Sequence, residues 1–331
     1  MEKNKKVTIL TPCFNGESYI ERFFDSILRQ TYPNIEVIFV DDGSKDKTKD
    51  IVDRYLPKFK NKKIPFKYIY QDNAGQASAV NNGLKYVKGD YITWIDSDDI
   101  LTDDSIEVRV RYFEKHPDIN WVRSEAYIVD EENLKEKIGY YKKINNNNSV
   151  DELFEEILFP TNDFYFCPVC YMARTSALFK VLKNKSIFTN RGGQNWQLML
   201  PLAYNYPCGY INKASGYYVV RNSSHSHEIR YDYEKIINRT YLHEELLVET
   251  LKRLNFKENS RYIKKVLKKY NWIRLYESVI SKDKKIFKDV YERHTSLNFL
   301  FMIFNLIGIN DVSYFLIRVI NKIKKIILIP T

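Results

Sequence analysis

The sequence predicts an α/β fold with a mainly parallel sheet, because strand, loop and helix patterns alternate through its first hundred residues. Apolar runs of strand length occur at 7–10, 35–40, 66–70 and 91–95. Amphipathic helical patterns follow the first three runs, at about 18–28, 48–55 and 76–86. Short links between such elements give parallel strands joined by right-handed crossovers. The polar loops at 11, 41, 72 and 96 should then share one rim of the sheet.

An acidic cluster, Asp96-Ser97-Asp98-Asp99, follows the strand at 91–95. It therefore lies at the carboxyl end of a strand, where open α/β sheets bind their ligands. Three carboxylates in four residues repel one another and lose hydration on burial, which favours a bound divalent cation. Hard oxygen ligands suit Mg²⁺ or Mn²⁺. From these residues alone, a simple helix cap is an equal alternative.

Asp42 is a second candidate on the same rim. A carboxylate at a strand end can accept a hydrogen bond from a ribose hydroxyl or a base N–H. The alternative is an Asx turn within Asp41-Asp42-Gly43-Ser44. The sequence has no G-x-G-x-x-G and no G-x-x-x-x-G-K-S/T, which excludes a Rossmann dinucleotide loop and a P-loop.

Five motifs, in this order and at this spacing, resemble the nucleotide-sugar half of family 2 glycosyltransferases with the GT-A fold. They are Thr11-Pro12-Cys13-Phe14-Asn15, 30–36, 40–46, Asn73-Ala74-Gly75 and Asp96-Ser97-Asp98-Asp99. The resemblance implies a GT-A domain over 1–230, with a nucleotide-sugar half at 1–105 and an acceptor half at 106–230. It also implies that Asp96 and Asp98 form the D-x-D motif that serves the ribose and the Mn²⁺ or Mg²⁺ on the diphosphate. The implied nucleotide-sugar-binding residues are Thr11, Pro12, Phe14, Asn15, Asp42, Asn73, Gly75, Asp96, Ser97 and Arg221.

The acceptor half matches the family only in part. Residues 171–176 resemble the strand and turn behind the acceptor site. Gln194-Asn195-Trp196 stands where many relatives carry an acidic E-D-W segment, whose Asp is the catalytic base. An amide takes no proton at neutral pH. Three alternatives follow: another carboxylate such as Asp163 or Glu125 is the base, Gln194 and Asn195 only position the acceptor, or transfer activity is lost.

Residues 217–227 resemble the closing strand and loop of the family domain. Relatives often place a histidine there that reaches the metal or the diphosphate, and the aligned residue is Arg221. A guanidinium can neutralise phosphate through paired hydrogen bonds. His225 and His227 are close enough in sequence to replace the missing histidine, and we take His225 as a candidate metal ligand. A surface loop is the alternative for both histidines.

The C-terminal part, 231–331, differs from the rest in charge and pattern. It holds 20 Lys and Arg against 11 Asp and Glu, which accounts for most of the net charge of +10. Its pattern is helical, and a basic and apolar helix such as 314–329 is typical of segments that lie on a membrane surface. Packing on its own domain is the alternative. Nucleic acid is not expected as a partner, because no RNA- or DNA-binding motif accompanies the charge.

Three local expectations complete the analysis. Cys167 and Cys170 have C-x-x-C spacing without a second metal-binding pair, so we expect reduced thiols. Residues 102–104 can cap a helix at 105–115, and 139–150 read as an exposed loop. The apolar run at 7–10 is too short for a signal peptide, so we expect a cytoplasmic protein with peripheral contact to the inner face of the membrane.

Together these features predict a metal-dependent, inverting glycosyltransferase that uses a nucleotide-diphosphate sugar, with UDP as the expected nucleotide. The acceptor would be a glycan or a lipid-linked molecule of bacterial surface-polysaccharide synthesis. The alternative is a nucleotide-sugar-binding scaffold protein of the same pathway without efficient transfer.

Overall fold

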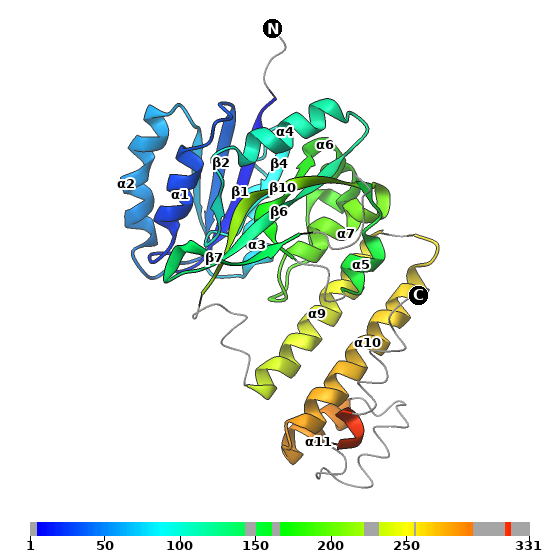
Figure 1. The fold of residues 1–331 in the computed structure, drawn as a ribbon. Coiled ribbons are helices and arrows are strands. Elements are labelled where there is room, and N and C mark those ends of the chain that lie inside the picture. Colours follow the sequence, from blue (N-terminus) through cyan, green and yellow to red (C-terminus); the bar gives the residue numbers. More distant parts are fainter. Residues whose placement is uncertain are drawn as a thin grey trace. The chain divides into compact units, whose positions relative to one another are not determined.

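We analysed a computed structural model of the chain, which describes residues 5–142, 150–160, 166–221, 232–254, 256–293 and 315–318. The chain divides into two compact units (Figure 1). The first unit comprises residues up to Arg221 together with 252–254, and the second comprises the remaining C-terminal residues. Each unit is described by itself.

The described residues of the first unit form one ten-stranded sheet in the order β3-β2-β1-β4-β9-β6-β10-β5, with β7 beside β6 and β8 beside β10. The strands are β1 (Val7–Cys13), β2 (Ile35–Asp41), β3 (Phe66–Tyr70), β4 (Tyr91–Trp94), β5 (Ile100–Leu101), β6 (Trp121–Asp130), β7 (Asn133–Tyr141), β8 (Val150–Asp151), β9 (Tyr171–Arg174) and β10 (Cys208–Val220). The helices are α1 (Ile20–Leu28), α2 (Thr48–Asn61), α3 (Gln76–Leu84), α4 (Ser105–Lys115), α5 (Phe154–Leu158), α6 (Thr175–Val181) and α7 (Asn195–Asn205), with 3-10 turns η1 (Pro168–Cys170) and η2 (Lys183–Lys185).

The predicted fold class is confirmed. Strands β3, β2, β1 and β4 are parallel to one another, and β6 is parallel to β10. Strands β9 and β5 pair in the antiparallel sense, so the sheet is mixed beyond β4. Every residue of β1 and β2 is buried, as expected for parallel strands that are covered on both faces.

Aromatic packing explains how helices cover the sheet. Phe24 of α1 contacts the rings of Phe39, Phe59 and Phe66, with centroids 5.2 to 5.6 Å apart. On α3, Gly83 lies so close to β1 that an added Cβ would stand 2.2 Å from Leu10 Cδ1. Large rings and one small residue therefore set how closely these helices approach the sheet.

Three predicted boundaries were wrong. Strand β1 continues past Leu10 through Thr11 and Pro12 to Cys13, because this segment stays paired with β2. Helix α2 continues past Tyr55 to Asn61 with Pro57 inside it, because Phe59 is buried in the aromatic cluster around Phe24. The loop predicted at 139–150 begins too early, since Gly139 pairs with Ile128 in the β6–β7 ladder. Within that range, residues 143–149 lie outside the described residues.

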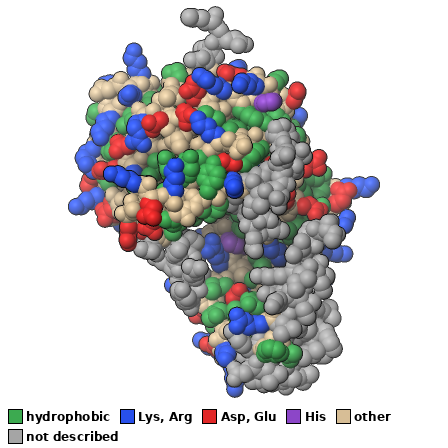
Figure 2. Space-filling model, in the orientation of Figure 1, with side chains coloured by type: hydrophobic (Ala, Val, Ile, Leu, Met, Phe, Trp, Pro, Cys, Tyr) green, Lys and Arg blue, Asp and Glu red, His purple; other side chains and the backbone are tan. Residues whose placement is uncertain are grey.

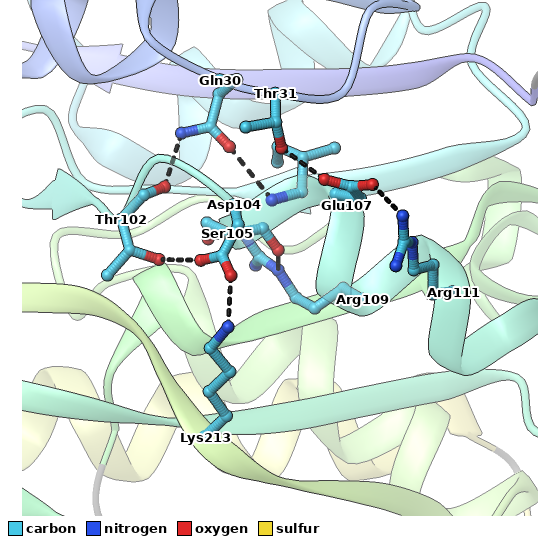
Figure 3. A network of polar contacts seen from close by, with 10 residues as sticks. Gln30, Thr31, Thr102, Asp104, Ser105, Glu107, Arg109, Arg111 and Lys213 are labelled. Atoms are coloured by element: carbon cyan, nitrogen blue, oxygen red, sulfur yellow. Dashed lines mark hydrogen bonds and ion pairs between the residues drawn. The ribbon is translucent and has the colours of Figure 1, made fainter.

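Hydrogen bonds tie the segment after the acidic cluster to the sheet (Figure 3). The Gln30 side chain donates to the Thr102 carbonyl at 2.7 Å and accepts from the Ile106 N–H at 3.1 Å. Helix α4 begins at Ser105 as predicted, but the Asp104 side chain does not cap it. Asp104 instead accepts from Thr102 Oγ1 and forms an ion pair with Lys213 of β10.

The second unit is helical, as predicted for the C-terminal part. Its helices are α9 (Tyr233–Leu254), α10 (Asn259–Ile280) and α11 (Lys284–Arg293). Buried apolar side chains form a core of their own, including Ile237, Leu275, Val279 and Phe287. No helix within the described residues has the length and hydropathy needed to cross a bilayer. Of the apolar stretches at 297–309 and 314–329, only residues 315–318 are described.

Charged side chains of both signs are interspersed over the visible face of the sheet-bearing unit (Figure 2). Such mixing leaves no extended field of one sign on that face. The four cysteines are buried and free, as predicted.

Candidate active site

The predicted rim is present, because the strand ends of β1, β2, β3 and β4 are linked by main-chain hydrogen bonds. The Asp42 N–H donates to the Cys13 carbonyl at 2.8 Å, and the Gln71 N–H donates to the Asp41 carbonyl at 3.0 Å. The Ile95 N–H donates to the Leu10 carbonyl at 3.1 Å. The loops after these strands therefore begin side by side at one edge of the sheet.

Asp42 is buried, with 3% of its surface exposed, and its carboxylate is fully engaged. It accepts hydrogen bonds from Gln71 Nε2 at 2.7 Å, Ala74 N–H at 2.9 Å, Gly75 N–H at 2.8 Å and Asn73 Nδ2 at 3.2 Å. These donors all belong to the loop between β3 and α3. Asp42 therefore orders the Asn73–Gly75 loop, which is a more extensive role than the Asx turn considered from the sequence.

Two glycines make this loop arrangement possible. Gly43 has φ +80°, and an added Cβ would lie 2.6 Å from the Asn73 main-chain nitrogen. Gly75 has φ +90°, a conformation that side chains disfavour. From a distant part of the chain, an Arg191 N–H donates to Asn73 Oδ1 at 3.0 Å. The 191–194 segment is thereby attached to the loop that Asp42 orders.

The residues predicted on the first loop differ in exposure. Thr11 and Pro12 are buried in β1, and Thr11 Oγ1 has no hydrogen-bond partner. Phe14 is 43% exposed at the end of the strand. Asn15 has φ +51° and its Oδ1 accepts from the Lys45 N–H at 2.9 Å. Among these four residues, Phe14 therefore offers an exposed aromatic ring to a planar ligand.

The acidic cluster holds carboxylates whose charge is not balanced. Burial, and next the charge of Asp98, raise the pKa of Asp96 to about 7. Burial, and next the charges of Asp98 and Asp96, raise the pKa of Asp99 well above its ordinary value. Asp99 Oδ1 accepts from the Val219 N–H at 3.2 Å, whereas its buried Oδ2 has no partner. This excess of buried negative charge favours a cation.

Arg221, which follows the last residue of β10, compensates part of the negative charge of the acidic cluster. Its Nε donates to Asp98 Oδ2 at 2.9 Å, and its guanidinium lies 4.1 Å from the centre of the Tyr19 ring. Arg22 of α1 donates to the main-chain carbonyl of Asp98 at 3.3 Å. Ser97 is buried nearby, with 6% of its surface exposed. Two arginines from different elements thus converge on Asp98.

Gln194 and Asn195 lie at the start of α7, close to the cluster. Gln194 is buried, and its Nε2 donates to Asp96 Oδ1 at 3.1 Å. Asn195 Oδ1 is buried without a hydrogen-bond partner. Trp196 anchors the same turn by donating its ring N–H to the Ile157 carbonyl at 2.8 Å. The side-chain amide of Gln194 therefore orients Asp96.

The other candidate bases and ligands are placed differently. Glu125 is buried on β6, and its two carboxylate oxygens accept from the hydroxyls of Tyr140 and Tyr210. Both of its oxygens are occupied within the protein, which argues against a role as the base. Asp163, His225 and His227 lie outside the described residues.

The residues present fit a divalent cation. The unpartnered Asp99 Oδ2 and the raised pKa of Asp96 indicate uncompensated negative charge, and the available donors are hard oxygens. Among the described residues, no group of three or more His, Cys, Asp or Glu side chains is arranged to hold a metal by itself. Asp96 and Asp98 would supply two ligands, and water and a diphosphate would supply the others.

Sequence reasoning missed three residues of this region. Arg22 lies on α1 and Tyr19 immediately before it, and the pattern there shows only an apolar face, so no sequence signal distinguished them. Arg191 precedes Gly192 and Gly193, and this Arg-Gly-Gly run beside the amide pair was a signal that could have been used. The described site therefore combines a loop ordered by Asp42 with a buried acidic cluster facing two arginines.

The first half of the sequence is similar to known glycosyltransferases. The model of glycosyl transferase family 2 matches residues 8–182. An uncharacterized glycosyltransferase of Rickettsia typhi is 41% identical over 109 residues, which are 33% of this chain and 32% of that protein. Glycosyltransferase GlyA of Streptococcus pneumoniae serotype 4 is 40% identical over 102 residues, which are 31% of this chain and 14% of that protein. The chain thus matches about a third or less of the length of these relatives.

Solved structures share the fold at low sequence identity. S. aureus TarS residues 1-349, in complex with UDP-GlcNAc, is 18% identical with a TM-score of 0.60. That match covers 87% of this chain and 82% of TarS 1-349. Mannosyltransferase PcManGT from Pyrobaculum calidifontis, in complex with GDP-Man and Mn²⁺, is 15% identical with a TM-score of 0.52. It covers 82% of this chain and 71% of the mannosyltransferase.

Proposed function

This chain belongs to glycosyl transferase family 2, whose model matches more than half of its residues, and on that basis we propose that it transfers a sugar from a nucleotide-diphosphate donor to an acceptor hydroxyl. The observation that carries the proposal is the buried acidic cluster Asp96–Asp99, on the same rim as Asp42. Such excess negative charge beside a ligand edge suits a cation and a diphosphate. UDP is the nucleotide we propose, supported by the fold shared with a UDP-GlcNAc complex.

On the donor side, the Asn73–Gly75 loop and Phe14 would flank the nucleotide base. Asp42 holds this loop in place through its hydrogen bonds with Ala74 and Gly75. Asp96 and Asp98 would hold Mn²⁺ or Mg²⁺. Arg221, which donates to Asp98 in this structure, would give up part of this hydrogen bonding to bind the diphosphate. Such a cation would offset the charge of the leaving diphosphate and act as a Lewis acid.

In the transfer, the acceptor oxygen forms a bond with the anomeric carbon while the bond from that carbon to the diphosphate oxygen breaks. Attack from the opposite face inverts the anomeric configuration. The acceptor hydroxyl loses its proton, and neither Gln194 nor Asn195 can receive it. We therefore assign to Gln194 the orientation of Asp96, which it contacts at 3.1 Å, and to Asn195 a place at the acceptor. Asp163 is the proposed base.

Calorimetric titration of UDP and Mn²⁺ tests the donor site. Asp98→Ala removes one cation ligand and the partner of Arg221, so we expect no measurable binding. Asp118→Ala is the matched control, since Asp118 is an exposed carboxylate after α4, and this variant should bind like the wild type. Unchanged affinity in Asp98→Ala would overturn the proposed site.

A scaffold protein that binds a nucleotide sugar without transferring it is the second candidate. The observation that favours it is that Gln194 and Asn195 carry amides where many relatives have acids. Release of UDP from UDP-sugars, with saturating Mn²⁺ and an extract containing acceptors, separates the two functions. Turnover supports the transferase, and tight binding without turnover supports the scaffold.

The setting we propose is synthesis of a surface polysaccharide on a lipid carrier at the inner face of the membrane. The acceptor would then be a glycan or a lipid-linked molecule, and the C-terminal part would supply peripheral membrane contact. Its excess of basic residues supports this, because anionic lipid attracts cationic segments.

A further inference from the structure

Helix α10 and the turn before it present four exposed cations, which we call the basic stripe: Lys257, Arg261, Lys264 and Lys268. Arg261, Lys264 and Lys268 are three and four residues apart within the first half of the helix, so they lie on one side of it. Lys257 lies in the turn, two residues before the first residue of α10. At 1.5 Å per residue the helical part of the stripe is roughly 10 Å long.

The four cations of the basic stripe have no acidic partners. None of them takes part in an ion pair with another described residue, although Glu258 stands between Lys257 and Arg261 in the sequence. Within α10 itself the acidic residue is Glu277. On other helices some exposed cations are paired four residues away, as in Lys49–Asp53 at 2.5 Å and Arg293–Asp289 at 3.2 Å.

Like charges at these spacings repel one another and destabilise a helix. The basic stripe therefore carries a charge that nothing in the described protein neutralises. An external anion with several charges in a row would relieve the repulsion along its whole length.

An exposed apolar side chain neighbours the basic stripe in the sequence. Leu267 is 39% exposed between Lys264 and Lys268, whereas Val266 and Tyr270 are buried. The outward side of α10 thus combines four cations with one aliphatic group, and the inward side packs within the second unit. This combination is typical of helices that lie on a membrane surface.

We propose that the basic stripe binds anionic lipid headgroups, and that among the described residues it is an element through which this protein contacts a membrane. The inference deepens the proposed function, because it assigns the membrane contact to particular residues and names its lipid class. The attraction energies of exposed cations to an anionic surface add to a first approximation. Four cations together therefore change the partition of the protein between water and membrane by orders of magnitude.

Lipid suits the stripe better than nucleic acid does. Sites for single-stranded nucleic acid combine cations with aromatic side chains on which bases stack. The neighbouring rings of Phe256 and Tyr262 are both half-buried and contact each other, with ring centroids 5.7 Å apart. The exposed apolar group on this side is aliphatic, and it can enter the acyl boundary of a bilayer.

Vesicle sedimentation with the full-length protein tests the proposal. The wild type should bind phosphatidylcholine vesicles that contain phosphatidylglycerol, and should bind pure phosphatidylcholine vesicles far less. The variant K257Q/R261Q/K264Q/K268Q should lose at least about 100-fold of its phosphatidylglycerol-dependent partition. The control K58Q/K60Q/K62Q/K63Q removes the same number of charges from exposed lysines in and after α2. This control should retain most of the phosphatidylglycerol-dependent partition.

Three results would overturn the proposal. They are equal binding of the wild type to both kinds of vesicle, equal losses in the stripe variant and its control, and tighter wild-type binding to a poly-dT oligonucleotide than to the anionic vesicles. Circular dichroism would confirm that the stripe variant keeps its helical content.

Donor titration keeps this test separate from the proposed function. The stripe variant should bind UDP and Mn²⁺ like the wild type, because its substitutions lie outside the donor site. If the wild type fails to bind the donor, the proposed function falls and the vesicle result still decides the membrane inference.

Discussion

Two acidic sites on the same rim of the sheet differ in how their charge is satisfied. The Asp42 carboxylate accepts four hydrogen bonds from the loop between β3 and α3, two of them from main-chain N–H groups. The Asp96–Asp99 cluster has one carboxylate oxygen without a partner and two residues whose pKa values are raised. The first site is complete within the protein, whereas the second holds buried carboxylates whose charge a cation would offset.

This difference shows that an aspartate at a strand end has no fixed role. Asp42 stabilises the loop that would receive the nucleotide, and its substitution should chiefly affect folding. Substitution within the acidic cluster should chiefly affect binding, because the cluster costs stability when no cation is present.

The largest expected effect on stability is that of Asp42→Ala. It removes the acceptor for Ala74 and Gly75 N–H and for two side-chain amides, so we expect a loss of about 2–4 kcal/mol in the free energy of unfolding. Urea denaturation measures it, with Asp118→Ala as the exposed control. A loss no greater than that of the control would contradict the structural role of Asp42.

Next in size is the pH dependence of the free energy of unfolding of the metal-free protein. The pKa of Asp96 is raised from 3.8 to about 7 on folding, so the folded state binds the proton more tightly than the unfolded state. The stabilisation is therefore present below about pH 4 and is lost as the pH rises through about 7.

Asp96→Asn should flatten the stability profile between these values, as thermal unfolding at several pH values would show. Saturating Mn²⁺ should reverse the trend in the wild type, because the cation binds the ionised form. A profile that is unchanged in Asp96→Asn would show that this carboxyl is not the group responsible.

A smaller effect is expected from Arg221→Met. The change keeps side-chain bulk over the Tyr19 ring and removes the charged contact with Asp98, so affinity for UDP and Mn²⁺ should fall roughly 10- to 100-fold. Arg221→Lys should recover only part of this, because an ammonium lacks the planar donors of the guanidinium. Full affinity in Arg221→Met would place the diphosphate elsewhere.

The smallest effect is expected from Glu125→Gln. Both oxygens of Glu125 accept from tyrosine hydroxyls, so the amide should cost about 1 kcal/mol of stability and leave the rate of sugar transfer within a few-fold. Transfer assays with the purified variant measure this. A loss of transfer with unchanged donor affinity would instead identify Glu125 as the catalytic base.

Much of the fold was predictable because it depends on local patterns. Strand β3 and helix α4 have the predicted bounds, and the rim that joins Asp42 with the acidic cluster follows from parallel strand pairing. Helix α2 was longer than predicted, and strand β7 was not predicted, since Phe59 and the β6–β7 ladder hold residues with weak local preferences. Contacts over long sequence distances overrode local propensity there.

The sequence by itself determined the α/β order of elements and the position of the carboxylates at strand ends, because hydrophobic periodicity and turn residues act over short range. Only the tertiary structure decided which carboxylates are satisfied. The bonds from Gln194 to Asp96 and from Arg221 to Asp98 join residues 98 and 123 positions apart. Charge compensation depends on distance in space, and no pattern of neighbouring residues specifies that distance.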